Sequence, residues 1–577
     1  MYSERIKQVQ NYLINNNIDG YIEFICDDHG SEYVNDHYKG VAFLSAFTGS
    51  AATLLITKSS SYLWTDGRYF LQASMQLLSS NTTLKKIGID ESIIDFISNN
   101  LKSVAFDFRV ANVPFVKQLV ANNIKVINEE KLLDNIWANR PTLPKKKIIS
   151  LPLNVVSCKA SLKCHKELSH IKSKKEYFVL VTALDDIAYL LNARGFDIKC
   201  NPVFISFLLL NKTNDKEIYT LYVDKAKVNN KMQEYFKNEK ITLKPYNSIY
   251  SDIKKINATI YFDSNKTNYK LYSSMKNGRN VTLWVSNKKA IKSKVEIIED
   301  KKVHIKDAIS MCKFLYYVKT YVNKKKMTEL SLMDKLYKLR RKYGSFEPSF
   351  STICGFNENG AIVHYSATNG TNKEIKNDGL LLVDSGGQYY YGTTDITRTI
   401  ALNNISDEMK YHFTLVLKSH IALANAVFSN DTTDGALDNI ARKPLWDVNL
   451  DYNHGTGHGV GYMLNVHEGP QSIRYNKNNP TIMKKGMITS DEPGLYFENK
   501  YGIRHENELL CVKNDKNTLK FEVITYVPFD LDGIDVNLLT NTEKEWLNNY
   551  HEMVYNKVNK YLTKREREFL KKATRKI

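Results

Sequence analysis

Apolar positions in the first half of the chain switch repeatedly between helical spacing and short continuous runs. Near the N-terminus, residues recur at the spacing of one helix face: Ile6, Val9, Tyr12 and Leu13. Short apolar runs flanked by turn residues predict strands over 52–56, 62–64 and 104–108. The alternation of helices with strands is typical of an α/β domain.

Residues 140–147 form a predicted linker, in which two prolines precede three lysines. The stretch that follows repeats the alternation of helices and strands. Apolar residues at helical spacing predict a helix over 177–191. Further apolar runs predict strands, over 203–210, 217–223 and 259–262. The two stretches are similar in size and order, which suggests a structural duplication, although no sequence repeat is visible.

The third stretch begins near Lys292 with a predicted helix over 303–319, and strands dominate from Leu380 onward. Those strands are predicted over 380–384, 389–391, 487–490, 509–512 and 521–526. The chain closes on a helix with one broad apolar face, for which Thr542 and Glu545 fit a capping box. We therefore expect three domains, at 1–145, 146–291 and 292–577.

Composition supports a multidomain globular protein. A chain of 577 residues is too long for one hydrophobic core. The formal charge is +19, but the lysines are spread along the whole chain, which argues against a nucleic-acid site. Seven scattered cysteines without a CxxC motif favour a reducing compartment. With no secretory leader and no apolar run near the ~20 residues of a membrane span, we expect a cytoplasmic protein without membrane contact.

Two carboxylates mark a candidate site in the segment LLLVDSGGQYYYGTTDITRT. Asp384 ends a predicted buried strand, and Asp395 follows after a glycine pair and a short reversal. A hairpin of this size can bring both side chains together. Aspartates also cap turns, so the pair alone is a weak signal.

Further metal-binding residue types follow in chain order. His454 and His458 lie in HGTGHGVG, and His467 lies in NVHEGP. Glu492 lies in SDEPG, and Glu506 lies on a predicted strand in GIRHEN. Carboxylates with one imidazole suit Mn²⁺, Co²⁺ or Zn²⁺, and carboxylates can bridge two metals about 3.5–4 Å apart.

This ordered set resembles the M24 metallopeptidases, whose catalytic domain has the pita-bread fold. The family's ligands are Asp, Asp, His, Glu and Glu in this chain order, and they match Asp384, Asp395, His458, Glu492 and Glu506. The resemblance implies two divalent metals, with Mn²⁺ favoured over Zn²⁺ and Co²⁺.

The resemblance extends over essentially the whole chain. FTGSA at 47–51 and WTDGRYF at 64–70 resemble the first domain of the three-domain Xaa-Pro aminopeptidases. ALDDIA at 183–188 and NPVF at 201–204 resemble the second, and WLNNYH at 546–551 resembles the C-terminal extension of the cytosolic type. The implied fold class is α/β and α+β: two creatinase-like domains followed by a pita-bread domain.

The resemblance also implies roles within the metal centre. Asp384 corresponds to a bidentate ligand of one metal, and Asp395 and Glu506 correspond to bridging ligands. His458 and Glu492 correspond to ligands of the second metal. Glu492 is also the expected proton acceptor for a hydroxide that bridges the metals and attacks the peptide bond.

Other residues are expected around this centre. His364 and His467 resemble the pair that contacts substrate and stabilises the tetrahedral oxygen. Arg68 resembles a first-domain arginine that reaches the substrate, either within one chain or across a dimer, although a structural ion pair would also explain it. His454, Tyr496 and Arg504 resemble residues that orient the ligands, with packing as an alternative for His454.

Two positions depart from the family pattern. Tyr391 replaces an aspartate before GTTD, which alters the turn but removes no ligand. His505 replaces an aliphatic residue beside Glu506, and strand alternation predicts that it points to the opposite face.

The resemblance predicts release of the N-terminal residue from peptides with proline at the second position, by a homodimeric enzyme. A prolidase-type dipeptidase is an alternative because prolidases share the metal ligands. A non-catalytic peptide-binding module is a second alternative, although the presence of all five ligands argues against it.

Overall fold

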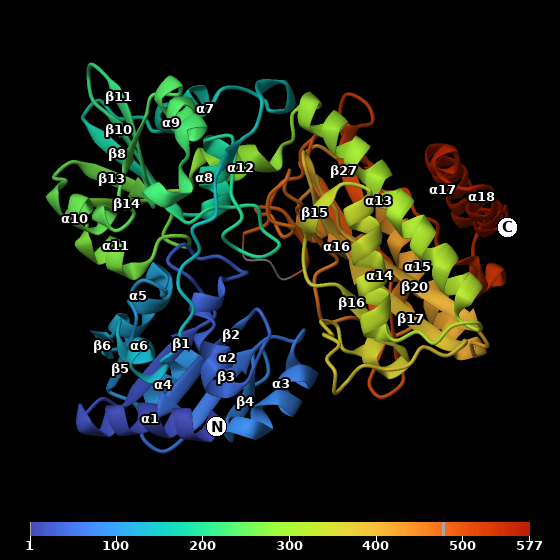
Figure 1. Cartoon of the computed structure of the whole chain (residues 1–577), viewed down its shortest axis with the longest axis horizontal. Coiled ribbons are helices and arrows are strands. Elements are labelled where there is room, and N and C mark those ends of the chain that lie inside the picture. Colours follow the sequence, from blue (N-terminus) through green and yellow to red (C-terminus); the bar gives the residue numbers. More distant parts are fainter. Residues whose placement is uncertain (1, 476–478) are drawn as a thin grey trace. The chain divides into compact units, whose positions relative to one another are not determined.

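The computed structural model describes residues 2–475 and 479–577, and the chain divides into two compact units, Met1–Ser286 and Asn287–Ile577 (Figure 1). Among the described residues, no helix is both long enough and apolar enough to cross a membrane.

The first unit contains a six-stranded sheet with the order β4-β3-β2-β1-β5-β6. Its strands are β1 Gly20–Phe24, β2 Ala52–Thr57, β3 Ser61–Thr65, β4 Thr83–Lys86, β5 Ser103–Phe106 and β6 Lys125–Asn128. The helices along this stretch include α1 Tyr2–Asn15, α2 Gly40–Ser45, α3 Phe70–Gln76, α4 Ile93–Asn100, α5 Val113–Ala121 and α6 Leu132–Ile136. Val9 and Leu13 of α1 are buried, as their helical spacing predicts.

A second six-stranded sheet follows in the same unit, with the order β12-β11-β10-β8-β13-β14. Its strands are β8 Tyr177–Val181, β10 Ser206–Lys212, β11 Glu217–Val223, β12 Ile241–Lys244, β13 Thr259–Phe262 and β14 Gly278–Asn280. The helices are α7 Ala160–His170, α8 Leu184–Leu190, α9 Asn230–Asn238, α10 Ser248–Lys255, α11 Tyr269–Ser274 and α12 Trp284–Ala290, the last of which crosses the unit boundary.

The two sheets share one topology. In each, the central strand pairs in parallel with the strand on one side and antiparallel with the strand on the other. The next pairings outward also agree in direction in the two sheets. The duplication that the sequence suggested is therefore present in the backbone.

The predicted helix over 177–191 is wrong in its first part. Residues Tyr177–Val181 form β8, at the centre of the second sheet, and only Leu184–Leu190 form helix α8. The run YFVLV is aromatic and β-branched, and a short fully apolar run has the same appearance in a buried strand as in a buried helix.

The second unit is built around a long hairpin and two further antiparallel sheets. A three-stranded sheet orders β16 Ile353–Phe356, β17 Asp378–Ser385 and β20 Ile396–Asn403, and a four-stranded sheet orders β21 Val427–Ser429, β28 Thr518–Val523, β27 Asn507–Lys513 and β24 Ile488–Asp491. The third orders β15 Ser345–Pro348, β18 Gly387–Tyr389 and β19 Gly392–Thr393. Two-stranded pairs join β22 Gly457–His458 to β23 Ser472–Ile473, and β25 Gly494–Phe497 to β26 Tyr501–Arg504.

Helices complete this unit (Figure 1). They are α13 Lys294–Tyr321, α14 Glu329–Lys342, α15 Asp407–Ala424, α16 Asp434–Trp446, α17 Asn541–Val558 and α18 Lys564–Ala573. One hydrophobic cluster contains residues of α13, the central hairpin, α17 and α18, so both C-terminal helices are part of the core of this unit. The chain therefore closes on α18, one helix beyond the one that the sequence predicted.

The predicted cap of α17 is displaced by two residues. The capping box is formed by Thr540 and Glu543, and Thr542 and Glu545 lie inside the helix. Both pairs fit the same spacing, but it is the Thr540 side chain that accepts the Glu543 N–H at the start of the helix. Tyr390 and Tyr391 likewise form a turn after β18, where the sequence predicted that the strand continues.

Candidate active site

The two aspartates meet because of the register of the β17–β20 hairpin. Asp384 pairs with Thr397 near the end of β17, and Asp395 immediately precedes β20. The reversal between them needs glycine at position 386, because a Cβ there would lie 1.8 Å from the Thr394 carbonyl oxygen. Both carboxylates are buried, at 8% and 4% exposure.

His458 is delivered by a strand that packs directly on β24. A Cβ at Gly457 would lie 2.0 Å from the Ser490 carbonyl oxygen, so only glycine permits this approach. The Ser490 hydroxyl accepts the His458 N–H at 3.0 Å and lies 3.1 Å from Glu492 Oε1. This contact fixes the histidine beside the end of β24.

The five predicted ligands come together in overlapping groups. His458 Nε2 lies 3.4 Å from Asp395 Oδ2 and 3.4 Å from Glu492 Oε1. Two triplets connect the five residues, with ligand atoms within 4.8 Å of one another inside each triplet: His458, Glu492 and Glu506, and Asp384, Asp395 and Glu506.

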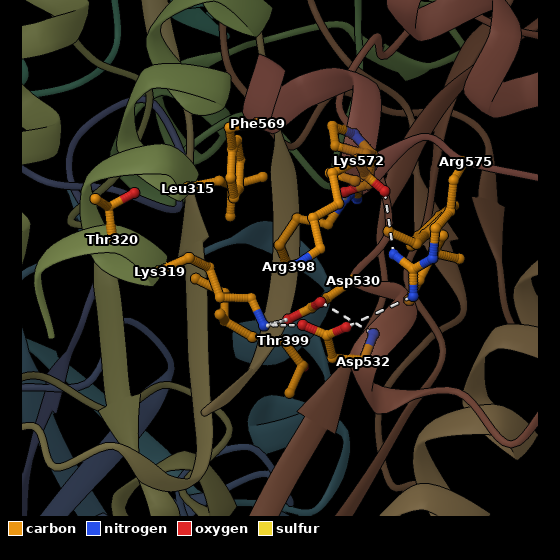
Figure 2. Close-up of a pocket in the computed structure, with 15 residues that line it drawn as sticks. Leu315, Lys319, Thr320, Arg398, Thr399, Asp530, Asp532, Phe569, Lys572 and Arg575 are labelled. Atoms are coloured by element: carbon orange, nitrogen blue, oxygen red, sulfur yellow. Dashed lines mark hydrogen bonds and ion pairs between the residues drawn. The ribbon is translucent and has the colours of Figure 1, made fainter. Parts of the chain in front are cut away.

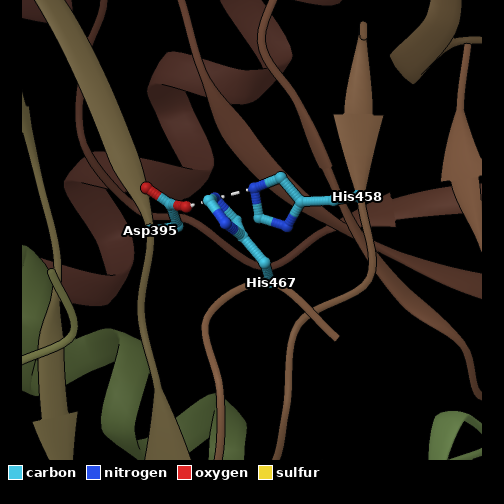
Figure 3. A group of neighbouring side chains, drawn as sticks. All are labelled: Asp395, His458 and His467. Atoms are coloured by element: carbon cyan, nitrogen blue, oxygen red, sulfur yellow. Dashed lines mark ion pairs between the residues drawn. The ribbon is translucent and has the colours of Figure 1, made fainter. Parts of the chain in front are cut away.

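His467, in the loop after β22, lies beside the same group of predicted ligands. Its ring centroid lies 4.3 Å from that of His458, and it forms a ligand-type group with Asp395 and His458. Figure 3 shows the His458 ring directed toward Asp395 with the His467 ring beside it.

The crowding of carboxylates has a strong electrostatic effect. Burial, assisted by repulsion from Asp395 and Asp384, raises the pKa of Glu492 to about 7. Burial and the same neighbours raise the pKa of Glu506 well above its usual range. Burial lowers the pKa of His458, but Asp395 and Glu492 outweigh it and raise the value to about 9. The site therefore favours bound positive charge.

The donor set fits divalent metal ions. His458 Nδ1 lies 3.0 Å from the Gly459 carbonyl oxygen, so Nδ1 donates there and Nε2, which faces two carboxylates, is the nitrogen on which a metal ion can replace a proton. Asp384 Oδ1 is buried without a hydrogen-bond partner. An imidazole nitrogen and an unpartnered oxygen directed into a carboxylate cluster are groups that a cation between them would bind.

A network of hydrogen bonds from residues next to the predicted ligands orients two of them. Arg504 donates to Asp384 Oδ2 at 2.6 Å and to the Tyr496 hydroxyl at 2.7 Å. That hydroxyl lies 2.8 Å from His454 Nε2. Thr397, which Arg504 also contacts, donates to Glu506 Oε2 at 2.7 Å. The three residues predicted to orient the ligands thus form one network that ends on Asp384.

A second supporting network was not anticipated. His420 of α15 lies 3.0 Å from Asp491 Oδ2 and 3.1 Å from Asn507 Nδ2. Asp491 and Asn507 are the immediate neighbours of Glu492 and Glu506. The only sequence signal was this adjacency, because nothing along the chain connects α15 to these two strands.

His505, the second departure from the family pattern, is a packing residue. It is fully buried with its ring 4.2 Å from Phe413 and 5.6 Å from Phe529. Burial lowers its pKa well below the usual range, so the ring is neutral. Among the described residues, none of the ligand-type groups includes it.

Two predicted substrate residues lie outside these groups. His364 is half-buried in the loop between β16 and β17, and no ligand-type group of the described residues contains it. Arg68, in the first unit, forms a two-pronged ion pair with Asp66 at 2.9 and 2.8 Å, and Glu32 lies 3.7 Å away. The ion-pair alternative for Arg68 is therefore realised, and its role toward substrate stays a prediction.

A separate cavity of about 240 Å³ lies between α13, β20 and α18 (Figure 2). In its wall, Lys319 bridges Asp530 and Asp532. Arg398 also lines the cavity and donates to the Glu506 carbonyl oxygen at 2.5 Å. This cavity contains none of the five ligands.

Family models match the chain along most of its length. Two regions, 5–136 and 139–296, match the creatinase/prolidase N-terminal domain. Residues 301–513 match metallopeptidase family M24, and residues 517–577 match the C-terminal region of peptidase M24.

Curated relatives are similar over nearly the full chain. A probable Xaa-Pro aminopeptidase P from Fusarium vanettenii is 36% identical, covering 97% of this chain and 96% of its own. Aminopeptidase P2 from Arabidopsis thaliana is 35% identical, covering 94% of this chain and 84% of its own.

One solved structure matches the whole fold. The X-prolyl aminopeptidase of Caenorhabditis elegans, described as a cytosolic enzyme with a di-nuclear active site, has a TM-score of 0.95 and 31% identity. The match covers all of both chains.

Proposed function

The chain belongs to metallopeptidase family M24, and we propose that it is an Xaa-Pro aminopeptidase, which releases the N-terminal residue from peptides with proline in second position. The observation that carries this proposal is the likeness to Xaa-Pro aminopeptidases over both N-terminal regions as well as the catalytic domain. The family match for residues 301–513 alone would support only a metallopeptidase.

Five side chains would hold two divalent cations: Asp384, Asp395, His458, Glu492 and Glu506. When bound, two such ions lower the pKa of a shared water and stabilise the charge of a tetrahedral intermediate. Mn²⁺ is our preferred ion because four carboxylates with one imidazole form an oxygen-rich set, with Zn²⁺ and Co²⁺ as alternatives.

Glu492 would accept the proton of the attacking water. Its carboxylate lies at the edge of the ligand group, within 3.4 Å of His458 and beside the Ser490 hydroxyl. A carboxylate in this position can accept a proton from a water held within the ligand group. The same proton can then pass to the departing proline nitrogen.

His467 and His364 would contact the substrate. His467 stands beside His458 at the edge of the ligand group, where an imidazole N–H can donate to the developing oxyanion. His364 and Arg68 have their roles by resemblance only, and for Arg68 we propose that substrate competes with Asp66 for its guanidinium. We also propose a cytoplasmic location, in line with the cytosolic Caenorhabditis enzyme. A homodimer is proposed by resemblance to the family only.

Proline at the second position changes what the enzyme needs to recognise. The bond before proline is a tertiary amide without an N–H, so no acceptor is required for that group. Peptides whose second residue is not proline would present an N–H that finds no partner in such a site, which costs binding energy.

The proposal is tested with purified protein, stripped by a chelator and reloaded with Mn²⁺. We expect release of the N-terminal residue from Xaa-Pro-Yaa peptides, and loss of this release in the stripped protein. If the reloaded protein released no N-terminal residue from these peptides, the proposal would be wrong.

The length of the preferred substrate distinguishes a prolidase-type dipeptidase from an aminopeptidase. A dipeptidase would prefer Xaa-Pro dipeptides, whereas an aminopeptidase cleaves tripeptides and longer peptides as well. Metal-loaded protein that binds peptides without cleaving either substrate would instead support the non-catalytic module.

A further inference from the structure

A second cluster of ligand-type side chains lies apart from the five residues of the active site. It contains Asp300 and His304, which are four residues apart on α13, and Glu508 on β27. One ligand atom from each lies within 4.8 Å of the others. All three side chains are buried, with residue exposures of 3%, 3% and 0%. The spacing i, i+4 places the two helical residues on one face of α13.

His304 Nε2 lies farther from both carboxylates than a short charge-assisted hydrogen bond requires, at separations that leave room for an ion between the groups. His304 Nε2 lies 3.4 Å from Glu508 Oε2 and 3.8 Å from Asp300 Oδ2. Charge-assisted hydrogen bonds are shorter, at about 2.7–2.9 Å. Two ligands at about 2.0–2.2 Å from one tetrahedral ion lie about 3.4 Å apart.

Other histidines in the chain provide an internal comparison. His165 and His420 each lie 3.0 Å from a carboxylate oxygen, as expected for an ion pair. His458, in the M24 ligand set, lies 3.4 Å from both of its carboxylates. The distance from His304 to Glu508 matches that of the metal ligand.

Unpartnered atoms point to the same conclusion. Asp300 Oδ1, His304 Nε2 and Glu508 Oε2 are buried and have no hydrogen-bond partner. Leaving such atoms without a partner costs free energy. Without an ion, a protonated His304 and the more distant Lys292 are the cations that face the two carboxylates. A divalent cation bound by one oxygen of Asp300, by His304 Nε2 and by an oxygen of Glu508 would replace the proton of His304 and balance both carboxylates.

We propose that Asp300, His304 and Glu508 bind a third divalent transition-metal ion, such as Zn²⁺ or Mn²⁺, in a structural site. Asp300 offers two oxygens, so the three residues can supply four donor atoms. The site joins α13 to β27 within the second unit. Glu508 also accepts the Asp395 N–H through Oε1 at 2.7 Å, so the ion would steady the backbone of an active-site residue.

Metal stoichiometry tests the proposal without reference to activity. Full-length chain is stripped with a chelator, loaded with Zn²⁺ or Mn²⁺, freed of excess ion and analysed by mass spectrometry of the elements. We expect three ions per wild-type chain and two in Glu508→Gln. The glutamine keeps an oxygen for the Asp395 N–H while its amide nitrogen replaces the proposed ligand.

Three further variants sharpen the result. His304→Gln should also lose one ion. His551→Gln is the matched control, because this buried histidine accepts the Phe529 N–H at 3.1 Å, and it should keep all three ions. Asp384→Asn should lose ions from the active site while keeping the third, which separates failure of this proposal from failure of the peptidase proposal.

Diffraction from metal-loaded wild-type crystals provides a measurement that does not depend on any variant folding. We expect an anomalous peak between Asp300, His304 and Glu508 in addition to those at the active site. A wild-type chain with no peak there, or one that binds two ions with the same number in Glu508→Gln, would overturn the third site.

Discussion

At the residue scale, the catalytic prediction concerns Glu492. Replacing it with glutamine keeps the shape and one oxygen but removes the group that accepts a proton. We expect Glu492→Gln to lower kcat on an Xaa-Pro-Yaa peptide by about 10²–10⁴-fold while the fold is retained. Glu498→Gln, an exposed change in the turn between β25 and β26, should leave kcat unchanged. Turnover by Glu492→Gln at the wild-type rate would remove Glu492 from the role of base.

A second residue-scale prediction concerns Tyr496, whose hydroxyl joins Arg504 to His454. In Tyr496→Phe, Arg504 loses an acceptor and holds Asp384 less firmly. We expect metal affinity, measured by competition with a chromogenic chelator, to fall about 10–100-fold. Tyr561→Phe, at an exposed site after α17, is the control. Unchanged affinity in Tyr496→Phe would mean that the network does not hold the ligands.

At the scale of elements, the turn between β18 and β19 carries strain. Tyr391 has a φ of 75°, in the left-handed region that asparagine and glycine adopt more readily than a bulky residue. The family's aspartate at this position has the short side chain that the region tolerates. Replacement of the family's aspartate by Tyr391 therefore places a bulky residue in a strained backbone conformation.

We expect Tyr391→Asn to raise the free energy of unfolding by about 0.5–1 kcal/mol, measured in urea. Tyr390→Asn, one residue earlier in the same turn, should bring no gain, because its ring packs at 5.3 Å from Phe346. Equal effects of the two substitutions would show that backbone strain is not the cause.

The observed bounds of strands and helices show where apolar patterns predict an element correctly. Strands β11 and β13 have the bounds that their apolar runs predict, because turn residues flank both. β8 was missed, since its environment as a central strand makes both faces apolar and removes the period of two. The cap of α17 was displaced because two overlapping segments satisfy one local rule.

At the scale of the whole molecule, one buried histidine connects the two duplicated sheets of the first unit. His29 Nδ1 lies 2.9 Å from the Thr182 carbonyl oxygen, and Nε2 lies 2.9 Å from the Tyr246 hydroxyl. Burial lowers the pKa of His29 to about 4. The folded protein thus keeps this ring neutral.

This lowered pKa predicts a pH dependence. Between pH 6.5 and pH 4 the unfolded chain binds a proton at this position that the folded chain does not. The free energy of unfolding therefore falls as the pH falls through this window, by up to about 3 kcal/mol from this residue. Above pH 6.5 the contribution is constant.

Urea unfolding of the full chain at several pH values measures this contribution. His29→Gln should be less stable at pH 7 but should lose less stability toward pH 4 than the wild type. His170→Gln, at an exposed position at the end of α7, should follow the wild-type profile. Identical profiles for wild type and His29→Gln would exclude His29 as a source of acid sensitivity.

Chain order and local chemistry were enough to identify the family and the α/β repeats and to predict five candidate ligands, because these depend on residue type, spacing and apolar period. Chain order and local chemistry could not predict which distant segments come into contact. The approach of His420 to the neighbours of Glu492 and Glu506, and the meeting of Asp300 and His304 with Glu508, join residues 71 or more positions apart. Only the packing of α13 and α15 against the strands brings these groups together, since no local pattern records which buried side chains will face one another.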